Sequence, residues 1–287
     1  MRRVRPFLSL FAAIVATLAV VACSESPGDG GSGDRGADDR HMDHDTLSRA
    51  LAATRTVETG RVQVTTVLTG LTDVPDPPPG GRVTLAVHRA AFDRHARRVE
   101  VETDLSSAAA LLGPPEGASV GDLSVPARMV AVGDVLYAQG GPMAAVLGRP
   151  PTGWVEIDRA AFVAQEPGSD TALLVLDPLG PFDVVGDAAG EVRVVGEEEL
   201  QGAPVTHVAS RVGADAGARG APLDVWIDRD GVIRRLELRL GPGPGAGRAA
   251  GAFGVGELVT KVELLDVGGP VDIAVPEASR GRGKGEP

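Results

Sequence analysis

The sequence predicts an α+β domain in which a few helices pack on one large antiparallel β-sheet. Residues 98–105 give the clearest indication, because Val, Val, Thr and Leu alternate there with Arg, Glu, Glu and Asp. Strict alternation gives a strand one apolar face and one wet face, which is typical of antiparallel pairing. Gly133-Asp134 between two apolar segments signals a hairpin. Residues 45–57 follow a helical period, and Asp45 can cap that helix.

The same residue patterns predict the remaining strands and helices. Further strands are expected at residues 61–69, 83–88, 129–132, 135–137, 191–195, 204–212, 223–227, 232–240, 258–264 and 271–275. Two apolar segments, residues 106–112 and 171–185, break the strand rhythm, and we expect them to form short helices or lids on the sheet.

The first residues have the pattern of a secretory signal. Arg2, Arg3 and Arg5 precede an apolar run at residues 7–22, which is short for a membrane span. The run ends in small residues before Cys23, the single cysteine of the chain, and resembles the lipobox of bacterial lipoproteins. This resemblance implies cleavage between Ala22 and Cys23 and a diacylglyceryl group on the Cys23 sulfur. The alternative is an uncleaved anchor helix with a chance cysteine.

This pattern divides the chain into four parts. Residues 1–22 are the expected signal peptide, and residues 23–44 are the lipidated cysteine with a Gly/Ser/Asp-rich flexible tether. Residues 45–276 form the folded domain, and residues 277–287 form a disordered tail. The expected location is outside the cytoplasm, anchored by lipid to the outer face of the cell membrane.

Composition excludes several kinds of partner. The chain has 28 basic and 39 acidic residues. Cleavage of the signal peptide would remove three basic residues and no acidic one, which leaves 25 basic and 39 acidic residues. A net charge of −14 (25 minus 39) argues against nucleic acid and against broad adhesion to anionic lipid headgroups. Aromatic residues make up only 3%, which disfavours sugar binding.

Short motifs offer little chemistry. A GxGxxG match at residues 28–33 lacks the strand and helix that a nucleotide loop needs. Residues 228–231 could suggest a calcium loop, but a hairpin turn explains them better. His41 and His44 could hold a metal weakly, although they lie in the tether. The remaining histidines, His88, His95 and His207, are expected on the wet face. We expect no enzyme, no metal and no cofactor.

Several short segments of this chain also occur, in the same order, in a known group of proteins. They are Gly133-Asp134-Val135-Leu136-Tyr137, Gly153-Trp154-Val155-Glu156-Ile157-Asp158, Asp177-Pro178-Leu179, Val194-Val195-Gly196-Glu197-Glu198, Gly202-Ala203-Pro204-Val205-Thr206-His207 and Leu223-Asp224-Val225-Trp226-Ile227-Asp228 with Gly231. Their order and spacing over residues 45–276 resemble the LppX/LprG-type lipoproteins of mycobacteria and their relatives, which share the fold of the carrier LolA.

The resemblance implies a strongly curved sheet, an open half-barrel, with helices on its concave face and an apolar cavity between them. It implies a protein that binds or carries a lipid or an acylated glycolipid in the cell envelope, with an envelope transporter as a further partner. The residues expected to line the cavity are Val62, Val64, Leu85, Val99, Val101, Leu173, Leu174, Leu236 and Leu238. The alternatives are a structural or signalling lipoprotein with a solid core that binds protein partners, and a hydrolase, for which the sequence offers no nucleophile and base.

Overall fold

A computed structural model describes residues 41–42, 44–70, 81–107, 125–140, 153–158, 176–212, 220–241 and 256–280. Cys23, the leader, the GxGxxG match, Leu173 and Leu174 lie outside these residues, as does most of the expected tether and of the segment at 106–112. No helix among the described residues is long and apolar enough to cross a membrane.

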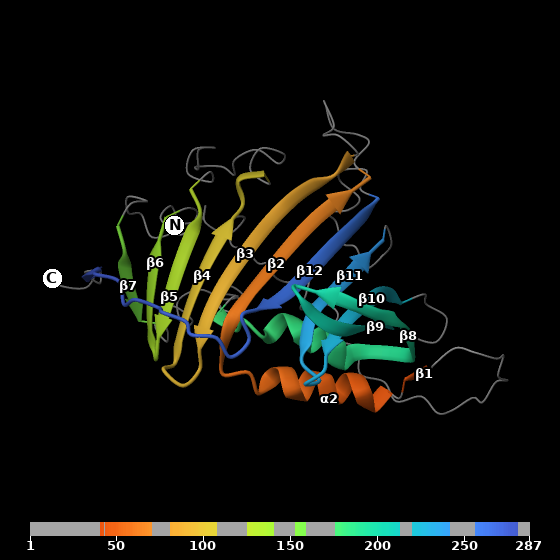
Figure 1. Ribbon diagram of the computed structural model, residues 1–287. Helices are drawn as coiled ribbons and strands as arrows, with labels where there is room; N and C mark the ends of the chain where they lie inside the picture. The colour runs from red at the N-terminus through yellow and green to blue at the C-terminus, as the bar shows by residue number, and fades with distance from the viewer. Residues whose placement is uncertain are drawn as a thin grey trace.

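One sheet dominates the described structure (Figure 1). Its thirteen strands lie in the order β1-β8-β9-β10-β11-β12-β2-β3-β4-β5-β6-β7-β13. The strands are β1 (His41–Met42), β2 (Thr59–Thr69), β3 (Val83–Asp93), β4 (Arg98–Asp104), β5 (Ala127–Val132), β6 (Val135–Gln139), β7 (Val155–Asp158), β8 (Ala188–Leu200), β9 (Ala203–Val212), β10 (Ala221–Asp228), β11 (Ile233–Leu240), β12 (Glu257–Leu265) and β13 (Ser279–Arg280).

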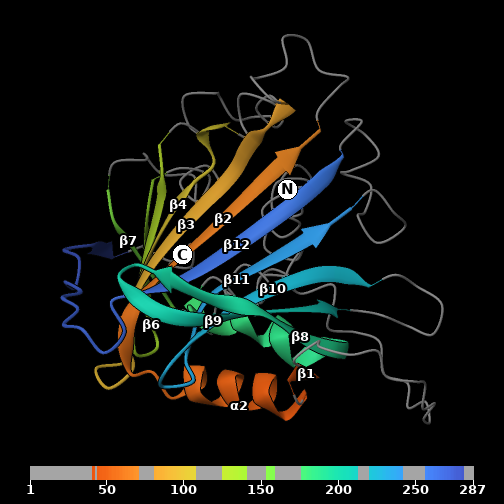
Figure 2. The ribbon, with the colours of Figure 1, turned by 45° about the vertical axis from the view of Figure 1, so that its right-hand side comes forward.

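The order of the strands explains why the sheet stays open. From β2 to β12, each strand pairs antiparallel with its neighbour in sequence, with one exception: β7 and β8 do not pair, and β12 pairs with β2 instead. The sheet is therefore an up-and-down meander whose opening falls between β7 and β8, and it is strongly curved (Figure 2). The predicted antiparallel half-barrel is confirmed. Only the two-residue β13 runs parallel to its neighbour, β7.

Turn chemistry supports this hairpin topology. Gln201 and Gly202 form the two-residue connection between β8 and β9, and both have positive φ, 55° and 78°. Positive φ at both central residues is the requirement of a type I′ turn, whose twist matches that of the flanking strands.

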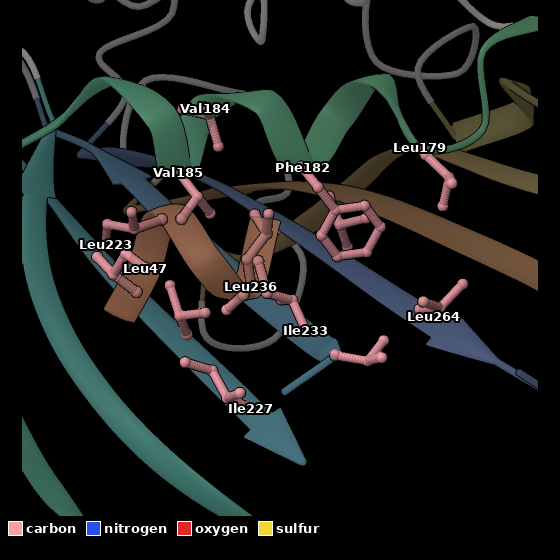
Figure 3. Close-up of a cluster of buried hydrophobic side chains, with 14 of the residues drawn as sticks. Leu47, Leu179, Phe182, Val184, Val185, Leu223, Ile227, Ile233, Leu236 and Leu264 are labelled. Atoms are coloured by element: carbon pink, nitrogen blue, oxygen red, sulfur yellow. The ribbon is translucent and has the colours of Figure 1, made fainter. Parts of the chain in front are cut away.

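In the described part of the chain, two helices cover one face of the sheet, which we call the inner face. The helix α2 (His44–Arg55) buries Leu47, Ala50 and Thr54 along one side, as the helical spacing predicts. The 3₁₀ helix η4 (Gly180–Asp187) lies in the connection between β7 and β8 and buries Phe182 completely. Figure 3 shows the side chains of both helices meeting the sheet.

Polar contacts fix α2 in place. The buried Thr54 hydroxyl donates to the Ala50 carbonyl at 2.7 Å and accepts from the Ile233 amide at 2.9 Å, which ties the helix to β11. Arg55, in the last turn, donates from Nε to Asp183 of η4 at 2.9 Å and from Nη1 to Asp177 at 3.2 Å. The two helices therefore form one unit over the β8 to β12 side of the sheet.

The expected elements are mostly found, with differences at both ends of the described chain. Residues 271–275 form no strand: Ile273 is buried, and its carbonyl accepts a hydrogen bond at 2.9 Å from the side chain of Arg98 rather than from the backbone of a neighbouring strand. Ser279 and Arg280, expected in the tail, pair with β7. His41 and Met42, expected in the tether, pair with β8.

Candidate ligand-binding face

The register of the strands places the inner-face side chains in rows that cross the sheet. One row joins Val208, Val225, Leu236, Val262, Val64, His88, Thr103 and Ala127. The next joins Leu264, Val62, Ala90, Val101, Met129, Ala138 and Val155. No residue of either row carries a fixed charge. The described inner face is therefore apolar over its whole width, with His88 and Thr103 as the polar members of these two rows.

Among the described residues, the buried side chains of this face form two clusters. The first, under α2 and η4, contains large side chains, among them Leu47, Phe182, Leu236 and Leu264 (Figure 3). The second lies on β4, β5 and β6 and consists of Val101, Met129, Ala131, Leu136 and Ala138 with Leu176. The core is therefore divided, with the larger side chains on the side that the helices cover.

A strip of half-buried residues separates the two clusters. Ala90 of β3 and Val99 of β4 contact both clusters, yet neither is fully buried. His88 is half-buried on the same face, between Val64 and Thr103 in the register. We call His88, Ala90 and Val99 the seam. It is a partly accessible strip, apolar at Ala90 and Val99 and polar at His88, in the middle of a face whose flanks are packed.

Polar groups gather at one end of the seam. His88 Nδ1 lies 2.9 Å from Oγ1 of Thr103, whose side chain is 1% exposed. Thr66 and Thr260, both buried, oppose each other on β2 and β12 in the adjacent row. Partial desolvation of the His88 ring by burial lowers its pKa to about 4, so the imidazole is neutral at pH 7.

The residues that the sequence assigned to a cavity occupy different environments. Val62, Val64, Leu236 and Leu238 belong to the cluster under the helices, and Val101 belongs to the second cluster. Val99 lies in the seam. These six are on the inner face, as the alternation predicts.

The expected orientation of β3 was wrong. The alternation of residues 83–88 predicts Leu85 inside and His88 outside. A bulge opposite Thr66 and Val67 shifts the register, so that Ala86 and His88 oppose Thr66 and Val64. Leu85 has no register partner on β2 and is only half-buried. The His88 site was therefore missed, although Phe92 on the same side of β3 was a signal for it.

The outer face is charged, as the alternation of the strands predicts. One row across it joins His207, Trp226, Arg235, Glu263, Gln63, Arg89, Glu102, Arg128 and Gln139. Glu263 is 8% exposed and pairs with Arg235 at 2.6 Å and Lys261 at 2.7 Å. Burial opposes ionisation of Glu263, but the hydrogen bonds from these two cations outweigh it and lower its pKa.

His207, expected on the wet face, lies there in a tight network. Its ring stacks on Trp226 with centroids 4.3 Å apart. Nδ1 lies 2.8 Å from Glu198 and Nε2 lies 3.0 Å from Asp224. Trp226 Nε1 donates to Glu198 at 2.8 Å, and this bond is the main cause that lowers the Glu198 pKa. Both ring nitrogens of His207 lie within hydrogen-bond distance of carboxylates of the sheet, so the network links β8, β9 and β10.

The structure also describes the segment that the sequence suggested as a calcium loop or a hairpin turn, residues 228–231. Asp228 Oδ1 accepts from the amides of Asp230 and Val232, at 3.0 and 2.9 Å, in the turn between β10 and β11. This confirms the hairpin interpretation of residues 228–231. Among the described residues there is no group of three or more side chains able to hold a metal ion. The side chains of His41 and His44 are outside the description.

Comparisons with known proteins give the following similarities. A scan of family models and a search of curated proteins find no match. Among solved structures, the lipoprotein LppX of Mycobacterium tuberculosis is 14% identical, with 80% of this chain and 97% of that chain covered and a TM-score of 0.42. LprF of Mycobacterium bovis is 13% identical, with 81% and 96% covered and a TM-score of 0.44. A LolA superfamily protein of Nitrosomonas europaea is 8% identical, with 80% and 94% covered and a TM-score of 0.26.

Proposed function

We propose that this chain is a non-enzymatic lipoprotein, anchored through Cys23 to the outer face of the cell membrane, that binds or carries a lipid or an acylated glycolipid along the seam. An envelope transporter that loads or unloads the protein belongs to the same proposal. The lipobox-like residues before Cys23 support the anchor. The order of the sequence motifs, which resembles that of envelope lipoproteins, supports the lipid ligand.

The observation that carries the proposal is the division of the inner-face core. In a closely packed domain the apolar face of a sheet is covered continuously. Here Ala90 and Val99 touch both clusters and still keep accessible surface. An apolar chain lying along them would bridge the clusters. Each methylene that it removes from water contributes about 0.8 kcal/mol, so a single long acyl chain would suffice for stable binding.

The proposal is tested by filling the seam. Val99→Trp should abolish binding of a fluorescent fatty acyl probe, because the indole would occupy the accessible strip. The free energy of unfolding should change little, since overpacking costs about 1–3 kcal/mol only where a side chain is already surrounded. Glu102→Trp is the matched control: it lies on the outer face of the same strand, with its side chain 40% exposed, and should change neither quantity.

The outcomes separate the proposal from its rival. A strong loss of stability in Val99→Trp, together with an unmodified protein that binds no acyl probe and yields no lipid on extraction and mass spectrometry, would favour the solid-core lipoprotein with protein partners. Anchoring is tested independently. Cys23→Ala should move the protein from membrane to soluble or unprocessed fractions, because the chain has no other thiol to accept lipid. Membrane-bound, processed Cys23→Ala protein would contradict the anchor.

A further inference from the structure

The seam has a polar end with an unusual composition. His88, Thr66, Thr103 and Thr260 lie on adjacent rows of β12, β2, β3 and β4, within an otherwise apolar face. No charged side chain belongs to these rows. Among the described residues of these four strands, a group bound here would meet neutral hydrogen-bonding partners and no counter-charge, because their arginines and their lysine lie on the outer face or near strand ends.

The position of His88 makes its ring available to a ligand. Thr103, at Nδ1, is the only hydrogen-bond partner of the ring within the part of the chain that the structure describes. Nε2 is left over, and the side chain is half-buried rather than enclosed. Nε2 is not among the described buried side-chain atoms that lack a hydrogen-bond partner, so it keeps contact with water. An oxygen of a ligand placed at Nε2 would replace that water and keep the hydrogen bond, whereas an apolar group would lose it.

Both tautomers lead to the same class of ligand. When Thr103 donates to Nδ1, Nε2 carries the proton and can donate to a carbonyl oxygen. When Nδ1 donates to Thr103, Nε2 accepts from a hydroxyl. A carboxylate or a phosphate would bring a full charge into this apolar face, where the described residues of these rows place no cation beside it, and such burial is strongly unfavourable.

We propose that His88, positioned by Thr103, is the polar subsite of the ligand-binding face and that it hydrogen-bonds a neutral ester or hydroxyl group of an acylated lipid. This inference rests on the proposed function, because it assigns the head of the same ligand whose acyl chain lies along Ala90 and Val99. The subsite selects neutral acyl esters over free fatty acids and over plain hydrocarbons.

The selectivity is measured with two probes, a fluorescent triacylglycerol and a fluorescent alkane of matched carbon number. The unmodified protein should bind the triacylglycerol more tightly. His88→Leu should weaken triacylglycerol binding by about three- to tenfold, the value of one hydrogen bond, and leave alkane binding unchanged. His95→Leu is the matched control, since His95 is exposed in the turn between β3 and β4 and should alter neither affinity.

Each outcome has one meaning. Equal triacylglycerol affinity in the parent protein and His88→Leu would overturn the subsite, and so would an equal loss for both probes, which indicates a purely steric role. A parent protein that binds neither probe would overturn the proposed function itself. If His88→Leu does not fold, Thr103→Val replaces it: the change is close to isosteric, removes the bond at Nδ1, and should reduce only the ester preference.

Discussion

The neutral imidazole of His88 predicts a specific dependence of stability on pH. Its pKa in the folded protein is about 4, against an ordinary value of 6.5. As the pH falls below 6.5, His88 therefore binds a proton in the unfolded chain but stays unprotonated in the folded chain until the pH nears 4. The contribution to stability is complete above pH 6.5, is lost between pH 6.5 and 4, and changes no further below pH 4.

The size of this effect follows from the shift. Each unit of pKa difference corresponds to about 1.36 kcal/mol, so the shift sets an upper value of about 3 kcal/mol. The half-buried ring retains some contact with water, and we expect a loss of about 1–3 kcal/mol between pH 7 and pH 4.

Urea unfolding of the parent protein and of His88→Gln at several pH values measures the effect. Glutamine keeps a polar side chain but does not titrate. Carboxylates also titrate in this range, but they are common to both proteins and cancel in the difference. The free energy of unfolding of His88→Gln should fall less steeply than that of the parent between pH 6.5 and 4. Parallel curves would refute the argument that His88 is held neutral by burial.

Three further predictions concern the frame around the seam. Leu236→Ala removes a fully buried side chain from the cluster under the helices and should cost about 2–5 kcal/mol in urea unfolding; a cost below 1 kcal/mol would show that this cluster is loosely packed. At Gly70, φ is +70° and a Cβ would lie 2.9 Å from backbone just before β12. Gly70→Ala should therefore lower stability more than Gly133→Ala, which has positive φ but open space and should cost about 1 kcal/mol; equal losses would contradict the steric argument. Glu198→Gln should cost less than about 1 kcal/mol, because the carboxylate is 46% exposed, and should shift Trp226 fluorescence; an unchanged spectrum would show that the bond does not persist in solution.

Much of this fold could be predicted because the alternation is strong. On β4 the charged residues occupy every second position, and the register confirms that Val99 and Val101 share the inner face. The pairing of His207 with Trp226 on the outer face could not be predicted from the sequence, because it depends on the register in which the consecutive strands β9 and β10 pair. The hairpin at residues 133–134 could be read, since it is local.

The site was less predictable for a physical reason. One extra residue in β3 reverses which side of that strand faces inward, and a bulge has no dependable signal in a single sequence. This reversal moved His88 from the expected wet face to the seam. A second difference came from residues 271–275, which alternate between apolar and other residues but form no backbone ladder with another strand.

The pairing of β2 with β12 has a consequence for how the chain reaches its native state. Thr69 and Glu257 are hydrogen-bonded neighbours 188 positions apart. Bringing together two points so distant in the chain costs an entropy that grows with loop length, on the order of 5 kcal/mol for a loop of this size. A chain that leaves the ribosome amino-terminus first must keep the edge of β2 unpaired until β12 has been synthesised. The two meanders, β2 to β7 and β8 to β12, can each form by local zipping, and their union is the late event. Topologies dominated by such distant contacts fold slowly, in milliseconds to seconds. Until β12 pairs with β2, the unpaired edge of β2 is therefore the part of the folding chain most exposed to incorrect strand pairing.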